Sequence, residues 1–157
     1  MKKFLKILII LLAVVILIFA VRKIYYSNVK IEPEELYLTK ENSVEEFKAT
    51  KGSYSWNDKG ISVIADSIGP LQMDFSKAID VKVNDKIYFT DYNWTNGGSA
   101  VILAKERTEV ARVTLETNLE ENYIVMPELT KGEYVIQINL ESDKGDVWYA
   151  AKINITE

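Results

Sequence analysis

Ile7 to Val21 is a run of fifteen consecutive apolar residues, and no other feature constrains the chain as strongly. A helix rises about 1.5 Å per residue, so Phe4 to Tyr26 is long enough to cross a hydrocarbon layer of about 30 Å. Lys6 and Arg22 would then extend their charged ends toward the two surfaces of the layer. We therefore expect one N-terminal transmembrane helix.

The fate of this helix allows three interpretations. A cleaved signal peptide usually has a small residue at position −3 of its cleavage site. Here Ile18-Phe19-Ala20 puts a bulky isoleucine at that position, and no cysteine follows for lipid attachment. We favour an uncleaved signal-anchor, with secretion after cleavage as the alternative. A buried core helix is the least favoured, because nothing polar marks an outer face.

The uncleaved reading divides the chain into four parts. We expect a cytoplasmic tail at 1–6, the signal-anchor helix at 7–26, a polar stalk at 27–35 and an extracytoplasmic domain at 36–157. The basic residues before the run exceed those after it by a modest margin, which favours a C-terminal domain outside the cytoplasm. The expected location is therefore the cell membrane, with a single pass.

Charge and composition exclude several classes of function for the domain. The first 27 residues hold five of the 19 basic residues and none of the 23 acidic ones, so the remainder carries a net charge of −9. Phosphates would repel such a body, so no nucleic-acid partner is expected. The chain has no cysteine and no histidine, which excludes disulfides, thiolate nucleophiles, Ser-His-Asp triads and the common zinc sites. We expect no metal, no cofactor and no enzymatic activity.

Beyond residue 35 the apolar residues alternate with a period of two, which predicts strands. Ser43 to Glu46 also fits a capping box that opens a short helix, although a hairpin around Glu41-Asn42 is favoured. The pattern predicts an all-β, antiparallel, immunoglobulin-like sandwich of about eight or nine strands. The expected strands include 36–40, 44–51, 60–65, 78–83, 86–92, 100–105, 109–116, 123–126, 133–140 and 146–155.

The last two strands carry the clearest alternation. Tyr134 opens an inward row of aliphatic residues after a turn glycine, and the final strand repeats the pattern with inward Tyr149. A tyrosine at this place ties a corner to nearby backbone in immunoglobulin-like sandwiches. We expect Trp148 and Lys152 to face outward.

Segment 52–60 gives the first candidate binding site. Tyr54 and Trp56 share one face of a short strand with a glycine turn at each end, and Asp58 and Asp66 lie nearby in sequence. These four residues suit a platform for a sugar, a peptide or a cationic group. The alternative is that Trp56 is the core tryptophan of the sandwich and the residues at 66–67 cap a turn.

This same region carries a family resemblance. A GSYSW strand at 52–56, an Ala-Asp-Ser turn at 65–67 and Pro70 resemble an uncharacterised family of exported proteins, lipoproteins or membrane-anchored, of low-GC Gram-positive bacteria. The Gly-x-Tyr strand at 132–134 and the final strand at 144–153 are similar too. The resemblance covers roughly residues 48–155. It implies an exported immunoglobulin-like domain and no assigned activity.

The loop at 91–99 gives the second candidate site. Tyr92 and Trp94 stand among small polar residues before a Gly-Gly pair, and loops at sandwich ends often bind partners. Trp94 either contacts a partner or folds back to cap the sandwich.

These observations predict a membrane-anchored binding or interaction module outside the cytoplasm. Its expected partner is a cell-envelope protein or a cell-wall component. Two alternatives stay open. The first is an accessory subunit of a membrane complex, in which the sandwich is purely structural. The second is a carboxylate-dependent hydrolase, for which no motif selects a pair from the 23 acidic residues.

Overall fold

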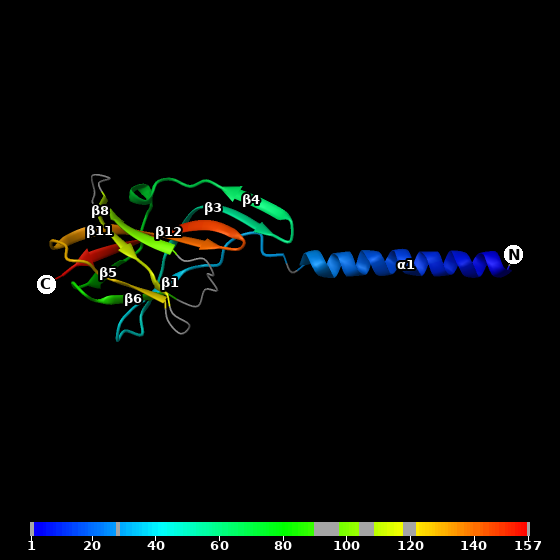
Figure 1. Ribbon diagram of the computed structural model, residues 1–157, viewed down its shortest axis with the longest axis horizontal. Coiled ribbons are helices and arrows are strands. Elements are labelled where there is room, and N and C mark those ends of the chain that lie inside the picture. The colour runs from blue at the N-terminus through cyan, green and yellow to red at the C-terminus, as the bar shows by residue number, and fades with distance from the viewer. Residues whose placement is uncertain (1, 28, 90–97, 104–108, 118–121, 157) are drawn as a thin grey trace.

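A computed structural model describes residues 2–27, 29–89, 98–103, 109–117 and 122–156. Figure 1 shows a long helix, α1, that projects from one end of a β-sandwich, with the C-terminus at the opposite end. The described part of the chain thus has two regions of different character: an isolated rod and a two-sheet body.

Helix α1 (Lys2–Ser27) is long and apolar enough to cross a membrane. Its mean hydropathy is 3.3 over the most apolar window, and none of that window is buried against the rest of the protein. The interpretation as a buried core helix is therefore wrong. Tyr25 and Tyr26 pack edge to face at the C-terminal end of the helix, with their ring centroids 5.3 Å apart.

The body consists of two sheets that pack face to face, as the sequence predicted. The smaller, five-stranded sheet has the strand order β2-β1-β6-β10-β9. Its strands are β1 (Tyr37–Lys40), β2 (Glu46–Lys48), β6 (Lys86–Phe89), β9 (Glu116–Thr117) and β10 (Asn122–Val125).

The larger, seven-stranded sheet has the order β4-β3-β12-β11-β7-β8, and β5 pairs with β12 as well. Its strands are β3 (Thr50–Asp58), β4 (Ile61–Ala65), β5 (Ala78–Val81), β7 (Gly98–Leu103), β8 (Glu109–Thr114), β11 (Gly132–Ser142) and β12 (Gly145–Ile155). A short 3-10 helix, η1 (Pro70–Gln72), lies between β4 and β5.

Most local strand predictions are confirmed. The hairpins β7–β8 and β11–β12 are antiparallel, and β1 pairs with β2, so the short helix considered at 43–46 does not form. Two details differ from the expectation. The described residues form twelve strands, because the stretch predicted at 44–51 divides between β2 and β3 and the stretch predicted at 109–116 divides between β8 and β9. The pair β5–β12 is parallel, and after β5 the chain crosses to β6 in the other sheet.

The core lies between the sheets and follows the predicted alternation. The inward residues of β11 and β12 are almost completely buried: Ile136, Ile138, Leu140, Val147, Tyr149, Ala151, Ile153 and Ile155. The Tyr134 hydroxyl donates a hydrogen bond of 2.8 Å to the Thr130 carbonyl, which is the predicted corner. An apolar interior therefore joins the two sheets.

Gly52 corrects one part of the sequence analysis. It was expected in a turn, but it lies inside β3, beside a register shift in the pairing with β12. A Cβ atom at Gly52 would come within 2.2 Å of the Trp148 ring. The glycine is needed because the indole of Trp148 lies directly on the β3 backbone.

Candidate functional site

The structure brings together only part of the predicted aromatic platform. Trp56 and Asp58 lie on the same face of β3 as Tyr54, which packs against the core. Trp56 is 7% exposed and Asp58 is 8% exposed, so neither forms an open platform. Asp66 is exposed beyond the end of β4, where the N–H of Ser67 donates to the Ser53 hydroxyl.

The second predicted site cannot be placed in the same way. Tyr92 and Trp94 lie outside the described residues. The third tryptophan, Trp148, is half-buried on the outer face of β12, as predicted, and lies over Gly52.

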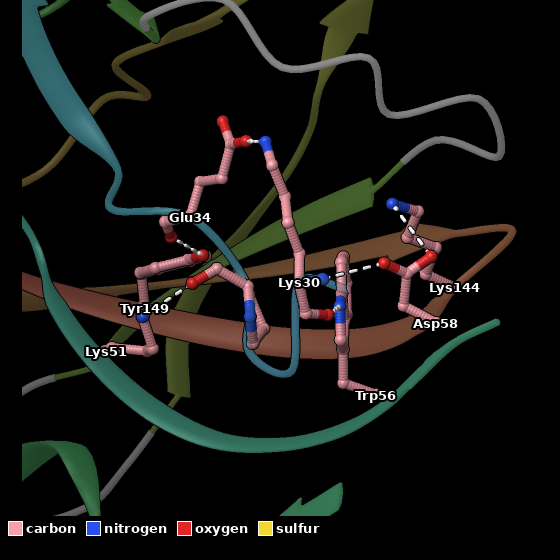
Figure 2. A network of polar contacts seen from close by, with 8 residues as sticks. Lys30, Glu34, Lys51, Trp56, Asp58, Lys144 and Tyr149 are labelled. Carbon is pink, nitrogen blue, oxygen red and sulfur yellow. Dashed lines mark hydrogen bonds and ion pairs between the residues drawn. The ribbon is translucent and has the colours of Figure 1, made fainter. Parts of the chain in front are cut away.

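Trp56 and Asp58 bind the main chain of Lys30, which belongs to the segment between α1 and β1. We call residues 29–36 the lead-in segment. The Lys30 N–H donates a 2.8 Å hydrogen bond to Asp58 Oδ2, and the Trp56 indole N–H donates a 3.0 Å bond to the Lys30 carbonyl. Figure 2 shows both contacts converging on Lys30. The two side chains therefore satisfy both polar main-chain groups of one residue.

Two further side chains bind the main-chain carbonyls of Pro33 and Glu34 in the same segment. Tyr149 donates its hydroxyl to the Glu34 carbonyl at 2.5 Å, and Lys51 Nζ donates to the Pro33 carbonyl at 2.6 Å. Figure 2 shows both side chains reaching the segment from β12 and β3. We call Lys51, Trp56, Asp58 and Tyr149 the docking cluster.

Charged pairs surround these main-chain contacts. Lys51 Nζ is 3.6 Å from Glu32 and 3.7 Å from Glu35, and Lys48 is 3.3 Å from Glu35. Lys144 lies 3.4 Å from Asp58 Oδ1. Basic side chains of the sandwich thus face acidic side chains of the lead-in segment.

The environment of Asp58 favours its ionised form. The main-chain N–H of Lys30 is the strongest influence, and together with the Lys144 ammonium it holds the pKa of Asp58 below its ordinary value. Burial acts in the opposite direction but is outweighed. A nearly buried carboxylate is therefore stable here because the docked segment supplies it with a donor.

The turn after β3 also contacts the helix. Lys59 donates a hydrogen bond of 3.3 Å to the carbonyl of Tyr25, and its ammonium lies 5.0 Å from the centre of the Tyr25 ring. Carbonyls in the last turn of a helix have no partner within the helix, and the helix dipole attracts a cation there. Adjacent residues of one turn, Asp58 and Lys59, thus hold both the lead-in segment and the end of α1.

A second surface lies on the outer face of the seven-stranded sheet. The chain between β4 and β5 crosses this face and leaves hollows beside it. One hollow of about 330 Å³ is lined by Leu71, Met73 and Phe75 from the crossing chain and by Leu103, Val135 and Lys152 from the sheet. An ion pair of 2.9 Å between Lys152 and Glu133 borders it.

A neighbouring hollow of about 360 Å³ shares Leu71 and Leu103 with the first and extends to Gln137. Among the described residues, no group of three or more acidic side chains is placed to hold a metal ion. The outer face offers open depressions lined by both apolar and polar side chains, with volumes at the lower end of the range of small-ligand sites.

Sequence analysis did not find Lys30, Lys51 or Tyr149 as members of a site. Tyr149 carried a usable signal, because a tyrosine in the inward row of a buried strand needs a partner for its hydroxyl. Neither Lys30 nor Lys51 carried such a signal in the sequence. At Lys30 the hydrogen bonds are made by main-chain atoms.

Comparison with known proteins adds little beyond the fold. No protein-family model matches the chain, and no curated protein matches it significantly. Among solved structures, the chain is similar to CopC from Methylosinus trichosporium OB3b, with 21% sequence identity and a TM-score of 0.41. The match covers 51% of this chain and 84% of that protein. The described strands and helix by themselves define the class of protein, a β-sandwich with an N-terminal apolar helix.

Proposed function

We propose that this protein is a single-pass, membrane-anchored binding module whose sandwich lies outside the cytoplasm and has no catalytic activity. The observation that carries the proposal is the docking of the lead-in segment on the sandwich, directly after a fully exposed apolar helix. A helix with that surface requires lipid around it. The docked segment then keeps the sandwich close to the bilayer.

The position near the bilayer determines what the module can reach. Its partner is a cell-envelope protein or a cell-wall component close to the membrane. The hollows beside Met73 and Leu103 supply a surface for that partner. We also propose membership of the exported immunoglobulin-like family of low-GC Gram-positive bacteria, which the GSYSW and Ala-Asp-Ser motifs support.

The absence of cysteine from the sequence makes the topology directly testable. We would introduce Val44→Cys, at a side chain that is fully exposed, and separately Lys3→Cys near the N-terminus. A membrane-impermeant maleimide should label V44C on intact cells, and it should label K3C only after permeabilisation. Labelling of K3C alone on intact cells would overturn the topology. Recovery of V44C protein in the medium without its first residues would favour the secreted form.

The binding role needs a separate measurement. A photo-crosslinking amino acid at Met73, in the outer hollow, should give a discrete crosslinked product in living cells. The same amino acid at Val44 is the matched control, because Val44 lies away from that hollow. Identical crosslinking patterns at the two positions would contradict a specific partner surface.

A further inference from the structure

The docking cluster recognises main-chain atoms of the lead-in segment. Its four hydrogen bonds end on the N–H of Lys30 and on the carbonyls of Lys30, Pro33 and Glu34. Such contacts do not depend on which side chains the segment carries. Main-chain hydrogen bonds of this kind provide affinity in many complexes with extended peptides.

The side chains of the segment add few chemical requirements for binding to the docking cluster. Pro33 and Leu36 are the buried residues of the segment, and Leu36 belongs to the core, while Ile31 is 53% exposed. Glu32 and Glu35 face Lys51, and Glu35 faces Lys48 as well. The bound sequence is thus an irregular segment with a bend at Glu32, a buried proline, a buried leucine at its end and acidic residues on both sides of the proline.

We propose that the docking cluster is a binding site for an irregular polypeptide segment and that the lead-in segment is its resident occupant. An acidic, proline-containing segment of a partner protein binds there when the lead-in segment leaves. This inference rests on the proposed role as a binding module, to which it adds a second site, separate from the outer hollows, and a class of partner for that site. Because the occupant is part of the same chain, its effective concentration is in the millimolar range or above, so a free peptide competes poorly. Exchange would loosen the position of the sandwich relative to α1, to which the chain still joins it.

The test weakens the occupant and leaves the docking cluster intact. Lys30→Pro removes the N–H that Asp58 accepts. Ile31→Pro is the matched control, because it introduces the same residue next door while both main-chain groups of Lys30 remain. The probe is a fluorescent synthetic peptide with the sequence of residues 29–37, titrated by anisotropy against the full chain in detergent micelles.

We expect the peptide to bind K30P at least tenfold more tightly than it binds the unmodified chain or I31P. The same peptide with an N-methyl group at the position of Lys30 should bind K30P at least tenfold more weakly. Adding Asp58→Asn to K30P should weaken binding of the parent peptide to a similar extent. Equal binding to K30P and I31P, or no loss on N-methylation, would overturn the proposal.

Hydrogen exchange in β11 shows whether K30P keeps its sandwich. If β11 exchanges freely, Pro33→Ala serves as the second variant, because it truncates a buried side chain of the occupant that lies outside the core cluster between the sheets. The same expectations and the same contradicting outcomes apply to it. The titration in micelles does not depend on topology, so its failure and a failure of cysteine labelling are distinguishable.

Discussion

Two regions of the molecule are stabilised by different forces. One is the interior between the two sheets, and the other is the contact between the lead-in segment and the docking cluster. The interior is almost entirely apolar, with Ile87, Ile124, Ile136 and Ile138 fully buried. The docking cluster uses an indole N–H, a carboxylate, a phenol and an ammonium group, each bound to the main chain. Apolar burial contributes about 25 cal/mol per Å², whereas a typical hydrogen bond contributes about 1 kcal/mol net.

The interior therefore determines the stability of the sandwich, whereas the docking contacts determine the position of the lead-in segment. Removing part of the interior should destabilise the whole sandwich, because both sheets depend on it. Removing one docking contact should instead free a short segment while the sheets stay folded. The following changes test that separation, beginning with the largest expected effect.

Ile138→Ala should cause the largest loss of stability. The side chain is fully buried on β11 between the sheets, and truncation of such a residue costs about 2–5 kcal/mol. Denaturant unfolding of the full chain in micelles, followed by tryptophan fluorescence, measures the change. Val110→Ala, at a side chain that is 41% exposed, is the control. A loss below about 1 kcal/mol would contradict the role given to the interior.

Gly52→Ala should cost about 1–3 kcal/mol in the same unfolding experiment, because the added Cβ meets the Trp148 ring. Trp148→Ala in the same chain should recover part of that loss by removing the obstructing ring. A double-mutant cycle separates the clash from any backbone effect of the alanine. Additive losses from the two changes would show that the close approach of ring and strand is not the cause.

Tyr149→Phe should have a smaller and more local effect. It removes the hydroxyl that donates to the Glu34 carbonyl and keeps the buried ring, so a loss of about 1 kcal/mol is expected. Hydrogen exchange should increase at residues 29–36 and stay unchanged in β11. Tyr134→Phe, which removes the corner bond to Thr130, is the matched control. Equal loss of protection in the lead-in segment and in β11 would erase the distinction between the two regions.

The smallest expected effect is the pH dependence of the hydrogen bond between Asp58 and the Lys30 amide. Its pKa is lowered in the folded protein, so its contribution is fully present above the unfolded value of about 3.9 and is lost as the pH falls through the lower folded value. Protection of the Lys30 amide should therefore persist at neutral pH and fall under more acidic conditions. In Asp58→Asn the amide should be less protected at neutral pH and should show a weaker pH dependence. NMR-detected exchange of that amide makes the measurement.

Some features were accessible from local sequence because they depend on short-range patterns. The fifteen-residue apolar run predicts α1 by length and composition alone. Alternation with a period of two predicts the hairpins β7–β8 and β11–β12, and it predicts the inward row that begins at Tyr134. It also places Tyr54 and Trp56 on one face of β3, where the structure has them.

The partner of that face could not be predicted. Trp56 and Lys30 are 26 positions apart, and Tyr149 lies 115 positions from Glu34. No periodicity links such distant residues. Every residue has main-chain donor and acceptor atoms, so the sequence of a segment does not show which of them will be bound. The sequence left two interpretations of Trp56 open, an exposed binding platform and a buried tryptophan. In the structure Trp56 is buried, and the lead-in segment of the chain itself covers it.

The sequence by itself therefore determined the apolar helix, the β-class of the domain and the inward rows of its strands, because these follow from hydropathy and local periodicity. Only the tertiary structure decided the two-sheet strand order, the parallel pair β5–β12 and the burial of the predicted site under the lead-in segment. The physical reason is the same in each case. Contacts between distant segments depend on where the folded chain brings main-chain donors and acceptors together, and side-chain identity only partly encodes that.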